Sequence, residues 1–141
     1  MEFITKTSAE KFYHMLTESG REDLQIFCMT GDDNQIDRKR ILREMDTADK
    51  DKAVILVATQ VVEAGIDIDM DIGYKDISKL DSEEQFIGRI NRNFKRKGVV
   101  YFFDMDNESG IYKEDYRVDT AYTLRKDEMK QLLADKNFGK Y

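Results

Sequence analysis

The chain has 141 residues, of which 40% are hydrophobic and 37% charged, with one cysteine and a net charge of −6. This length fits one domain with a core of its own, and the single cysteine excludes a disulfide framework. The acidic balance argues against a general polyanion binder, although it is compatible with a local basic patch. No apolar run is long enough for a membrane span and no signal-peptide pattern opens the chain, so we expect a cytoplasmic protein.

Apolar runs bounded by turn residues predict strands, and apolar residues at helical spacing predict helices. Two helices open on candidate capping boxes, Thr7 with Glu10 and Asp81 with Glu84. The fully apolar run 53–59 is typical of a strand that is covered on both faces of a parallel sheet. In chain order we expect a short strand at 2–5, a helix at 7–19, a strand at 23–30, a helix at 35–46, strands at 53–59 and 71–77, a helix at 81–92 and a strand at 98–105.

This alternation of strands and helices predicts an α/β domain with a mainly parallel sheet. We expect residues 1–104 to form this domain. The remaining residues, 105–141, are polar and fit no further strand–helix–strand unit. They are predicted to form a C-terminal extension beside the sheet, with a helix from about residue 115 to residue 133.

The expected helix 81–92 carries a polar stripe. Gln85, Gly88, Arg89 and Arg92 fall within an arc of about 100° at helical spacing, opposite an apolar face. A glycine inside a helix costs about 1 kcal/mol relative to alanine, so we expect a compensating close approach of a backbone or a phosphate. The alternative interpretation is a solvated basic face without a ligand.

The buried strand 53–59 ends at Thr59, and the residues that follow it include Gln60, Gly65 and Asp67. In open α/β sheets, ligands bind outside the carboxyl ends of the strands. A hydroxyl, an amide and a carboxylate at that position indicate a candidate binding loop. The alternative is an ordinary turn whose glycine serves only the backbone.

The two features together are more specific than either alone. T-Q-x-x-E-x-G-x-D at 59–67 and Q-x-x-G-R-x-x-R at 85–92 resemble motifs V and VI of superfamily 2 helicases. With L-D-S at 80–82, the chain looks most similar to the CRISPR-associated helicase-nuclease (Cas3) family of type I systems. The resemblance covers about residues 3–104, and it implies a three-layer RecA-like domain, the second of the two that form such helicases.

The sequence departs from the family pattern at two positions. Thr5 is all that remains of an Asn-Thr pair in the first turn, and Lys79 stands where a proline often precedes L-D-S. The chain also contains neither G-x-x-x-x-G-K-[ST] nor a Walker B acidic stretch. The resemblance therefore implies that ATP and Mg²⁺ are bound mainly by a first RecA-like domain that is separate from this chain. It also implies that the domain in this chain is inactive when isolated.

The resemblance also implies roles for single residues. Arg89 and Arg92 would act as arginine fingers on the γ-phosphate, and Gln85 would orient water or a phosphate. A planar, always charged guanidinium suits phosphate oxygens, which it meets in pairs. No metal ligand is expected. The further implied contacts are to ATP from Gly65, Asp67 and Gly88, and to nucleic acid from Thr59, Gln60, Thr30 and Thr5.

The implied partners are the first RecA-like domain, single-stranded DNA and the CRISPR surveillance complex (Cascade), with no membrane. Two other functions stay open at this point. The chain could be half of another superfamily 2 helicase or restriction translocase, or a binding module without catalysis. A binding module would bind DNA or a partner well by itself, whereas half of a helicase would have no ATPase activity alone.

Overall fold

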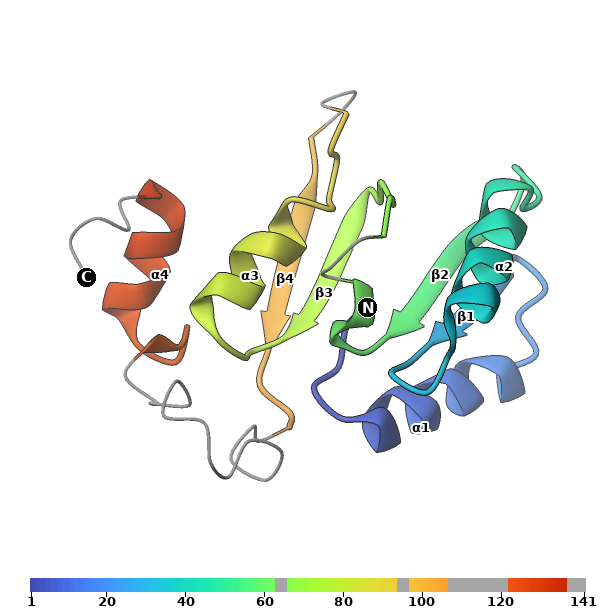
Figure 1. Ribbon diagram of the computed structural model, residues 1–141, viewed down its shortest axis with the longest axis horizontal. Coiled ribbons are helices and arrows are strands. Elements are labelled where there is room, and N and C mark those ends of the chain that lie inside the picture. The colour runs from blue at the N-terminus through green and yellow to red at the C-terminus, as the bar shows by residue number, and fades with distance from the viewer. Residues whose placement is uncertain (63–65, 94–96, 107–121, 137–141) are drawn as a thin grey trace. The chain divides into compact units, whose positions relative to one another are not determined.

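The computed structural model describes residues 1–62, 66–93, 97–106 and 122–136. The chain divides into two compact units, Met1–Ile68 and Asp69–Tyr141. Each unit contains its own pair of parallel strands with helices beside them (Figure 1). No helix within the described ranges has both the length and the apolar character that a membrane span needs.

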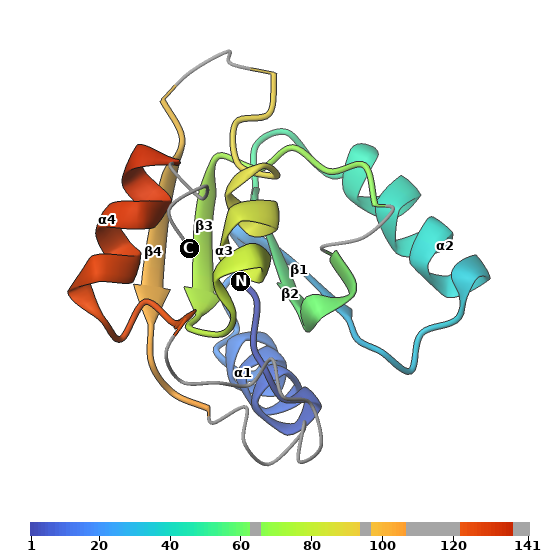
Figure 2. The same ribbon diagram turned by 60° about the vertical axis from the view of Figure 1, so that its left-hand side comes forward.

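The first unit is built on two parallel strands, which lie between two helices (Figure 2). The N-terminal segment adds a single parallel bridge, Glu2 with Ala58, where we expected a short strand at 2–5. The other expected elements of this unit are confirmed. They are α1 (Lys6–Glu18), β1 (Leu24–Met29), α2 (Gln35–Asp46) and β2 (Ala53–Ala58), followed by the short 3-10 helix η1 (Gln60–Val62).

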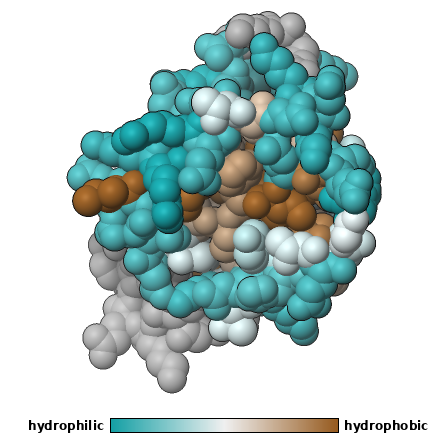
Figure 3. Space-filling model, turned by 90° about the vertical axis from the view of Figure 1, so that its right-hand side faces the viewer, coloured by the Kyte–Doolittle hydropathy of each residue, from teal (hydrophilic) through white to brown (hydrophobic). Residues whose placement is uncertain are grey.

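Strand β1 is half-buried from Leu24 to Cys28. Among the strands that the structure describes, β1 pairs with β2 alone, in the register Leu24 opposite Ala53 to Met29 opposite Ala58. Figure 3 views the molecule from the side of β1 and α2, where apolar surface lies inside a hydrophilic rim. Helices α1 and α2 both contact β1, so the apolar side chains of this strand pack against the two helices.

The N-cap of helix α1 is Thr5, two residues before the expected cap Thr7. The backbone of Thr5 is extended, and its hydroxyl accepts a hydrogen bond from the Ser8 amide at 3.2 Å. The predicted box of Thr7 with Glu10 is therefore wrong, because both residues lie inside the helix. Pairing of the N-terminal segment with β2 ends the extended backbone early enough for Thr5 to become the cap.

The second unit contains β3 (Ile72–Asp76), α3 (Leu80–Ile87), β4 (Val99–Phe103) and α4 (Asp127–Asp135). Strands β3 and β4 pair in parallel, which confirms both expected strands. On one face of this pair, Tyr74 and Tyr101 lie directly opposite each other with ring centroids 5.1 Å apart and rings 18° from parallel. Both tyrosines are exposed, at 40% and 53%.

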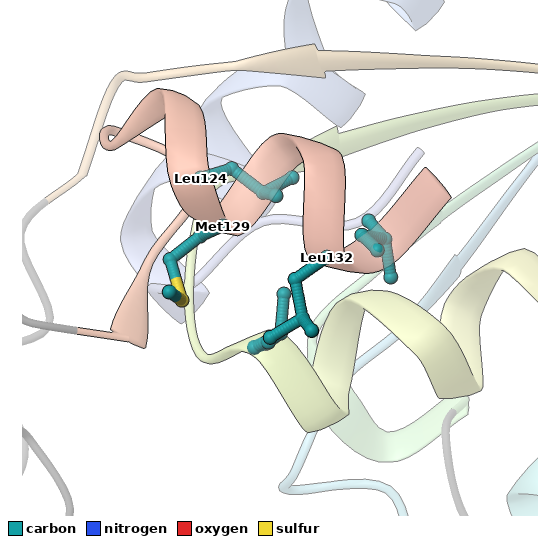
Figure 4. Packing of buried hydrophobic residues seen from close by; sticks show 5 residues of the cluster. Leu124, Met129 and Leu132 are labelled. Atoms are coloured by element: carbon teal, nitrogen blue, oxygen red, sulfur yellow. The ribbon is translucent and has the colours of Figure 1, made fainter. Parts of the chain in front are cut away.

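Helix α4 packs on α3 through an apolar cluster, in which Figure 4 shows Leu132 directed toward α3. Of the expected helix 115–133, residues 115–121 lie outside the described residues, 123–126 are not in an α-helix, and 127–133 are confirmed as part of α4. An extended Lys126 starts the helix late, and this lets Leu124 turn into the core. The cluster consists of Leu80, Leu124, Met129, Leu132 and Leu133, with Ile77, Ile87 and Phe102 against it.

Helix α3 differs from the expected helix 81–92 at both ends. It begins at Leu80, so the predicted capping box of Asp81 with Glu84 is wrong. The neighbouring Glu83 instead accepts the amide of Ser78 at 2.7 Å. The helix ends at Ile87 because the chain leaves it to form a parallel bridge between Ile90 and Met70.

Candidate functional site

The predicted site residues fall on both units, and each group has its own surroundings. The first unit holds the predicted nucleic-acid contacts and Asp67, and the second unit holds the two predicted arginine fingers. Gly65 lies outside the described residues. The first group is Thr5, Thr30, Thr59, Gln60 and Asp67, and the second is Gln85, Gly88, Arg89 and Arg92.

The three threonines of the first unit follow neighbouring parallel segments. Thr30 comes directly after β1 and Thr59 directly after β2, and the Thr59 amide donates to the carbonyl of Met29 at 3.1 Å. Thr5 follows the segment that pairs with Ala58. Because the carboxyl ends of parallel strands share one edge of a sheet, the fold brings these threonines to the edge where ligands bind.

Local hydrogen bonds fix the loop after β1. The Thr30 amide donates to the Asp33 carboxylate at 2.6 Å, and the Thr30 hydroxyl lies 3.4 Å from the same oxygen. Lys6 at the start of α1 pairs with Asp32 in this loop and with Glu10. The Asp32 and Glu10 carboxylates raise the pKa of Lys6. Thr30 and Thr59 are buried, at 6% and 9% exposed, so this unit holds their hydroxyl groups in ordered positions at its sheet edge.

The predicted arginines do not share a helical face with Gln85. Gln85 is exposed on α3, and Gly88 ends the helix as its C-cap. Arg89 follows in a tight turn, its amide donating to the Phe86 carbonyl at 2.9 Å, and Arg92 lies two residues beyond the bridge. The expected stripe along one helix is therefore wrong, because the bridge to Met70 redirects the chain after Ile90.

The segment after α3 is anchored to the start of the second unit. Met70 donates its amide to the Arg89 carbonyl at 3.1 Å and accepts the Asn91 amide at 2.7 Å. Asn91 adopts a left-handed conformation with φ of 50°. The Arg92 amide then donates to the Asp69 carboxylate at 2.7 Å. Half-buried Arg89 and exposed Arg92 are therefore presented by an ordered backbone.

Two glycines that we did not single out in the sequence allow this segment to pack closely. A Cβ atom on Gly73 would lie 2.6 Å from Phe86 Cε1 and 3.0 Å from Ile90 Cδ1. A Cβ atom on Gly98 would lie 2.9 Å from Asn91 Cβ and 3.0 Å from Ile90 Cγ2. A glycine in each strand pattern was the available signal, since it marks a close approach.

Gly88 has different surroundings. Its φ of −63° is ordinary for any residue, and an added Cβ would meet only backbone of its own helix, 3.3 Å from the Gln85 carbonyl oxygen. Gly88 is also exposed. The packing of the described residues therefore does not by itself require a glycine here, and the outward side of the position is open to a ligand.

A buried ion pair that we also did not predict joins β3 to α3. Lys75 and Glu83 are 1% and 0% exposed at their side chains, with Nζ 3.6 Å from Oε2. Lys75 Nζ lies 5.7 Å from the centroid of the Phe86 ring. Since burying one charge alone is costly, each of these residues needs the other. The pair fixes α3, and with it Gln85, on the sheet.

The chain shares the fold of the C-terminal RecA-like domain of helicases. It superimposes on T. fusca Cas3 in its ADP complex with a TM-score of 0.64 and 17% identity, over 97% of this chain and 20% of that chain. The C-terminal domain of the DEAD-box protein Dbp5 gives a TM-score of 0.60 and 22% identity, over 99% and 69%. The predicted fold class, α/β with a parallel RecA-like sheet, is confirmed.

Residues 4–95 match the family described as "CRISPR-associated nuclease/helicase Cas3, C-terminal", and the chain belongs to this family. The Cas3 of Methanothermobacter thermautotrophicus (strain Delta H) is 28% identical over 83 residues. That match covers 55% of this chain and 10% of the relative, so the chain spans a small part of its relative's length. The resemblance inferred from the sequence motifs is confirmed.

Proposed function

We propose that the chain is the second RecA-like half of an ATP-dependent superfamily 2 DNA helicase that unwinds and moves along target DNA in CRISPR interference. The family match over residues 4–95 carries the proposal, because it contains both helicase-like motifs. Within it, we assign residues 1–104 to the RecA-like domain and 105–141 to an extension. The partners are a first RecA-like domain, single-stranded DNA and the surveillance complex, in the cytoplasm.

ATP and Mg²⁺ belong mainly to the first RecA-like domain in this proposal. The residues of the second unit fit a polyphosphate, because an exposed Arg92 and a half-buried Arg89 follow a glycine that is open on its outward side. Mg²⁺ neutralises charge that develops on the phosphates. Within the described ranges, no three His, Cys, Asp or Glu residues gather as metal ligands.

The arginines supply positive charge where the γ-phosphate is transferred to water. A guanidinium remains charged at every physiological pH and donates two parallel hydrogen bonds to phosphate oxygens. Such a finger accelerates the reaction by about 10³–10⁵-fold. Gln85 orients the attacking water or a phosphate, and the turn at Gly65 and Asp67 contacts the nucleotide.

The nucleic-acid contacts belong to the first unit. Thr59 and Gln60 bind the backbone of a single strand, with Thr30 and Thr5 as further contacts. Hydroxyl and amide groups after strands donate to phosphate oxygens without reading the bases. The common sheet edge of Thr5, Thr30 and Thr59 supports this assignment.

The test combines the 141-residue chain with a matching first RecA-like domain and measures DNA-stimulated ATP hydrolysis. Arg89→Ala and Arg92→Ala should each lower turnover by about a hundredfold or more, since each removes charge stabilisation from the transition state. Arg43→Ala is the matched control, because Arg43 is exposed on α2, far along the chain from the motifs. It should leave turnover unchanged.

Losses of turnover below about threefold, the size expected for an exposed ion pair, would favour the alternative that Arg89 and Arg92 form a solvated basic face without a ligand. Tight DNA binding by the chain alone, with no ATPase activity in the combined protein, would instead support a non-catalytic binding module. Efficient ATP hydrolysis by the chain alone would contradict the assignment of ATP to another domain.

A further inference from the structure

Asp69, the first residue of the second unit, makes a group of contacts with the turn that carries Arg92. Its carboxylate accepts the Arg92 amide at 2.7 Å and the Asn93 amide at 3.4 Å. It also accepts the Asn93 side-chain amide, Nδ2 to Oδ2, at 2.6 Å. A single carboxylate 23 residues upstream thus holds both the backbone and a side chain of this turn.

The residues that precede Arg92 are held by other means. Backbone hydrogen bonds fix Arg89 and Asn91 against Met70, and the glycines at 73 and 98 seat Ile90. Those contacts end at Asn91, whose left-handed backbone turns the chain. At Arg92 and Asn93, the carboxylate of Asp69 holds the backbone of the chain.

We propose that Asp69 is a positioning residue, which fixes the turn 91–93 and so the direction in which the Arg92 side chain leaves the backbone. The inference rests on the proposed function of Arg92 and adds the group that holds it in place. Asp69 itself touches no reacting atom. It lies two residues beyond the last aspartate of the T-Q-x-x-E-x-G-x-D motif, and it acts through hydrogen bonds to the backbone.

The physical reason is preorganisation. An arginine side chain has many rotamers, and misplacing a catalytic group by about 1 Å can cost a hundredfold in rate. Hydrogen bonds from amides to an ionised carboxylate are stronger than neutral ones and prefer defined directions. Fixing the Arg92 amide therefore reduces the number of conformations that the Arg92 guanidinium can adopt.

The first experiment measures the exchange of the Arg92 and Asn93 amide hydrogens in the 141-residue chain by NMR. Asp69→Ala should speed exchange at these amides by about tenfold to a hundredfold, while the Asn91 amide keeps its bond to Met70. Asp135→Ala is the matched control, an exposed carboxylate at the end of α4. Unchanged exchange in Asp69→Ala would overturn the proposal.

The second experiment is a double-mutant cycle on DNA-stimulated ATP turnover in the chain combined with its first RecA-like domain. Asp69→Ala should lower kcat by about tenfold to a hundredfold with KM for ATP little changed. In the Arg92→Ala background, Asp69→Ala should add no further loss, because a residue that acts through Arg92 has nothing left to position. A further loss of the same size would overturn the proposal and indicate a general structural role.

Asp69→Asn keeps an acceptor oxygen for the Arg92 amide without the charge. It guards against an Asp69→Ala variant that fails to fold, and it should show a smaller loss in both experiments. Turnover of Asp69→Asn below that of a folded Asp69→Ala would contradict positioning by these hydrogen bonds. If Arg92→Ala itself loses less than about threefold, the proposed function of Arg92 fails, and amide exchange alone then decides whether Asp69 orders the turn.

Discussion

In the first unit, Thr30 and Thr59 come directly after the paired strands β1 and β2, and hydrogen bonds of the sheet fix where those strands end. In the second unit, carboxylate side chains hold the site residues in place: buried Glu83 holds α3, and exposed Asp69 holds the turn at Arg92. The comparison teaches that neighbouring motifs of one domain need different support. A hydroxyl group at a strand end is positioned by the sheet itself, whereas an arginine beyond a helix needs a separate anchor.

The strongest test of this comparison is the buried pair of the second unit. Glu83→Ala should destabilise the chain by about 3–5 kcal/mol, because it removes the carboxylate that pairs with the buried Lys75 ammonium group. Urea unfolding measures the effect. The double variant Lys75→Met with Glu83→Leu should restore stability, since an apolar pair of similar size removes both charges. A loss below about 1 kcal/mol for Glu83→Ala, the size of an exposed pair, would show that the pair is solvated.

The first unit has a buried ionisable group of its own, the amino group of Met1. Burial lowers the pKa of the Met1 amino group to about 6, from an ordinary value of 8.0. The unfolded chain therefore binds more protons between pH 6 and pH 8, and stability should rise by about 2 kcal/mol over that interval. Urea midpoints across this range measure the rise. A chain preceded by extra residues is the control, and an equal rise there would assign the effect to another group.

Close packing around Ile90 should matter less than the buried pair. Gly73→Ala should destabilise the chain by about 1–3 kcal/mol, because the new methyl group meets the Phe86 ring and Ile90. Gly31→Ala is the matched control, since an added Cβ there has no neighbour within 4 Å among the described residues and the φ angle of Gly31 is not positive. Thermal unfolding compares the two, and equal stabilities would mean that the segment shifts freely.

The smallest effect is expected at the cap of α1. Thr5→Ala should cost about 0.5–2 kcal/mol, because the Ser8 amide loses its hydroxyl acceptor, whereas Thr5→Ser should keep most of the stability. Chemical unfolding again measures the difference. A Thr5→Ala loss as large as that of Glu83→Ala would remove the contrast between the two units.

The strands and the first two helices could be predicted because their signals are local, as in the apolar run of β2 and the spacing of α2. The start of α1 could not be predicted from local signals, since Thr5 becomes the cap only through pairing of the N-terminal segment with β2. The end of α3 was missed for a related reason. Ile90 fits the helical pattern as well as it fits a bridge, and only the distant Met70 decides between them.

The candidate site shows the same division. The motifs identified the family and the residue types, because these motifs depend only on the spacing of residues in the sequence. The supports of the site could not be read in this way. Lys75 and Glu83 meet across two elements, and Asp69 reaches a turn more than twenty residues away, so their partners depend on the folded topology. The functional roles assigned to single residues are predictions, which the variants described above test.

The stacked tyrosines of the β3–β4 pair give the second unit an optical reporter. The chain contains no tryptophan, so tyrosine dominates its near-ultraviolet signal. Tyr74 and Tyr101 are stacked only while the two strands are in register. The difference between the circular dichroism spectra of the parent chain and Tyr74→Leu therefore follows the integrity of this sheet, while the first unit contributes equally to both spectra and cancels.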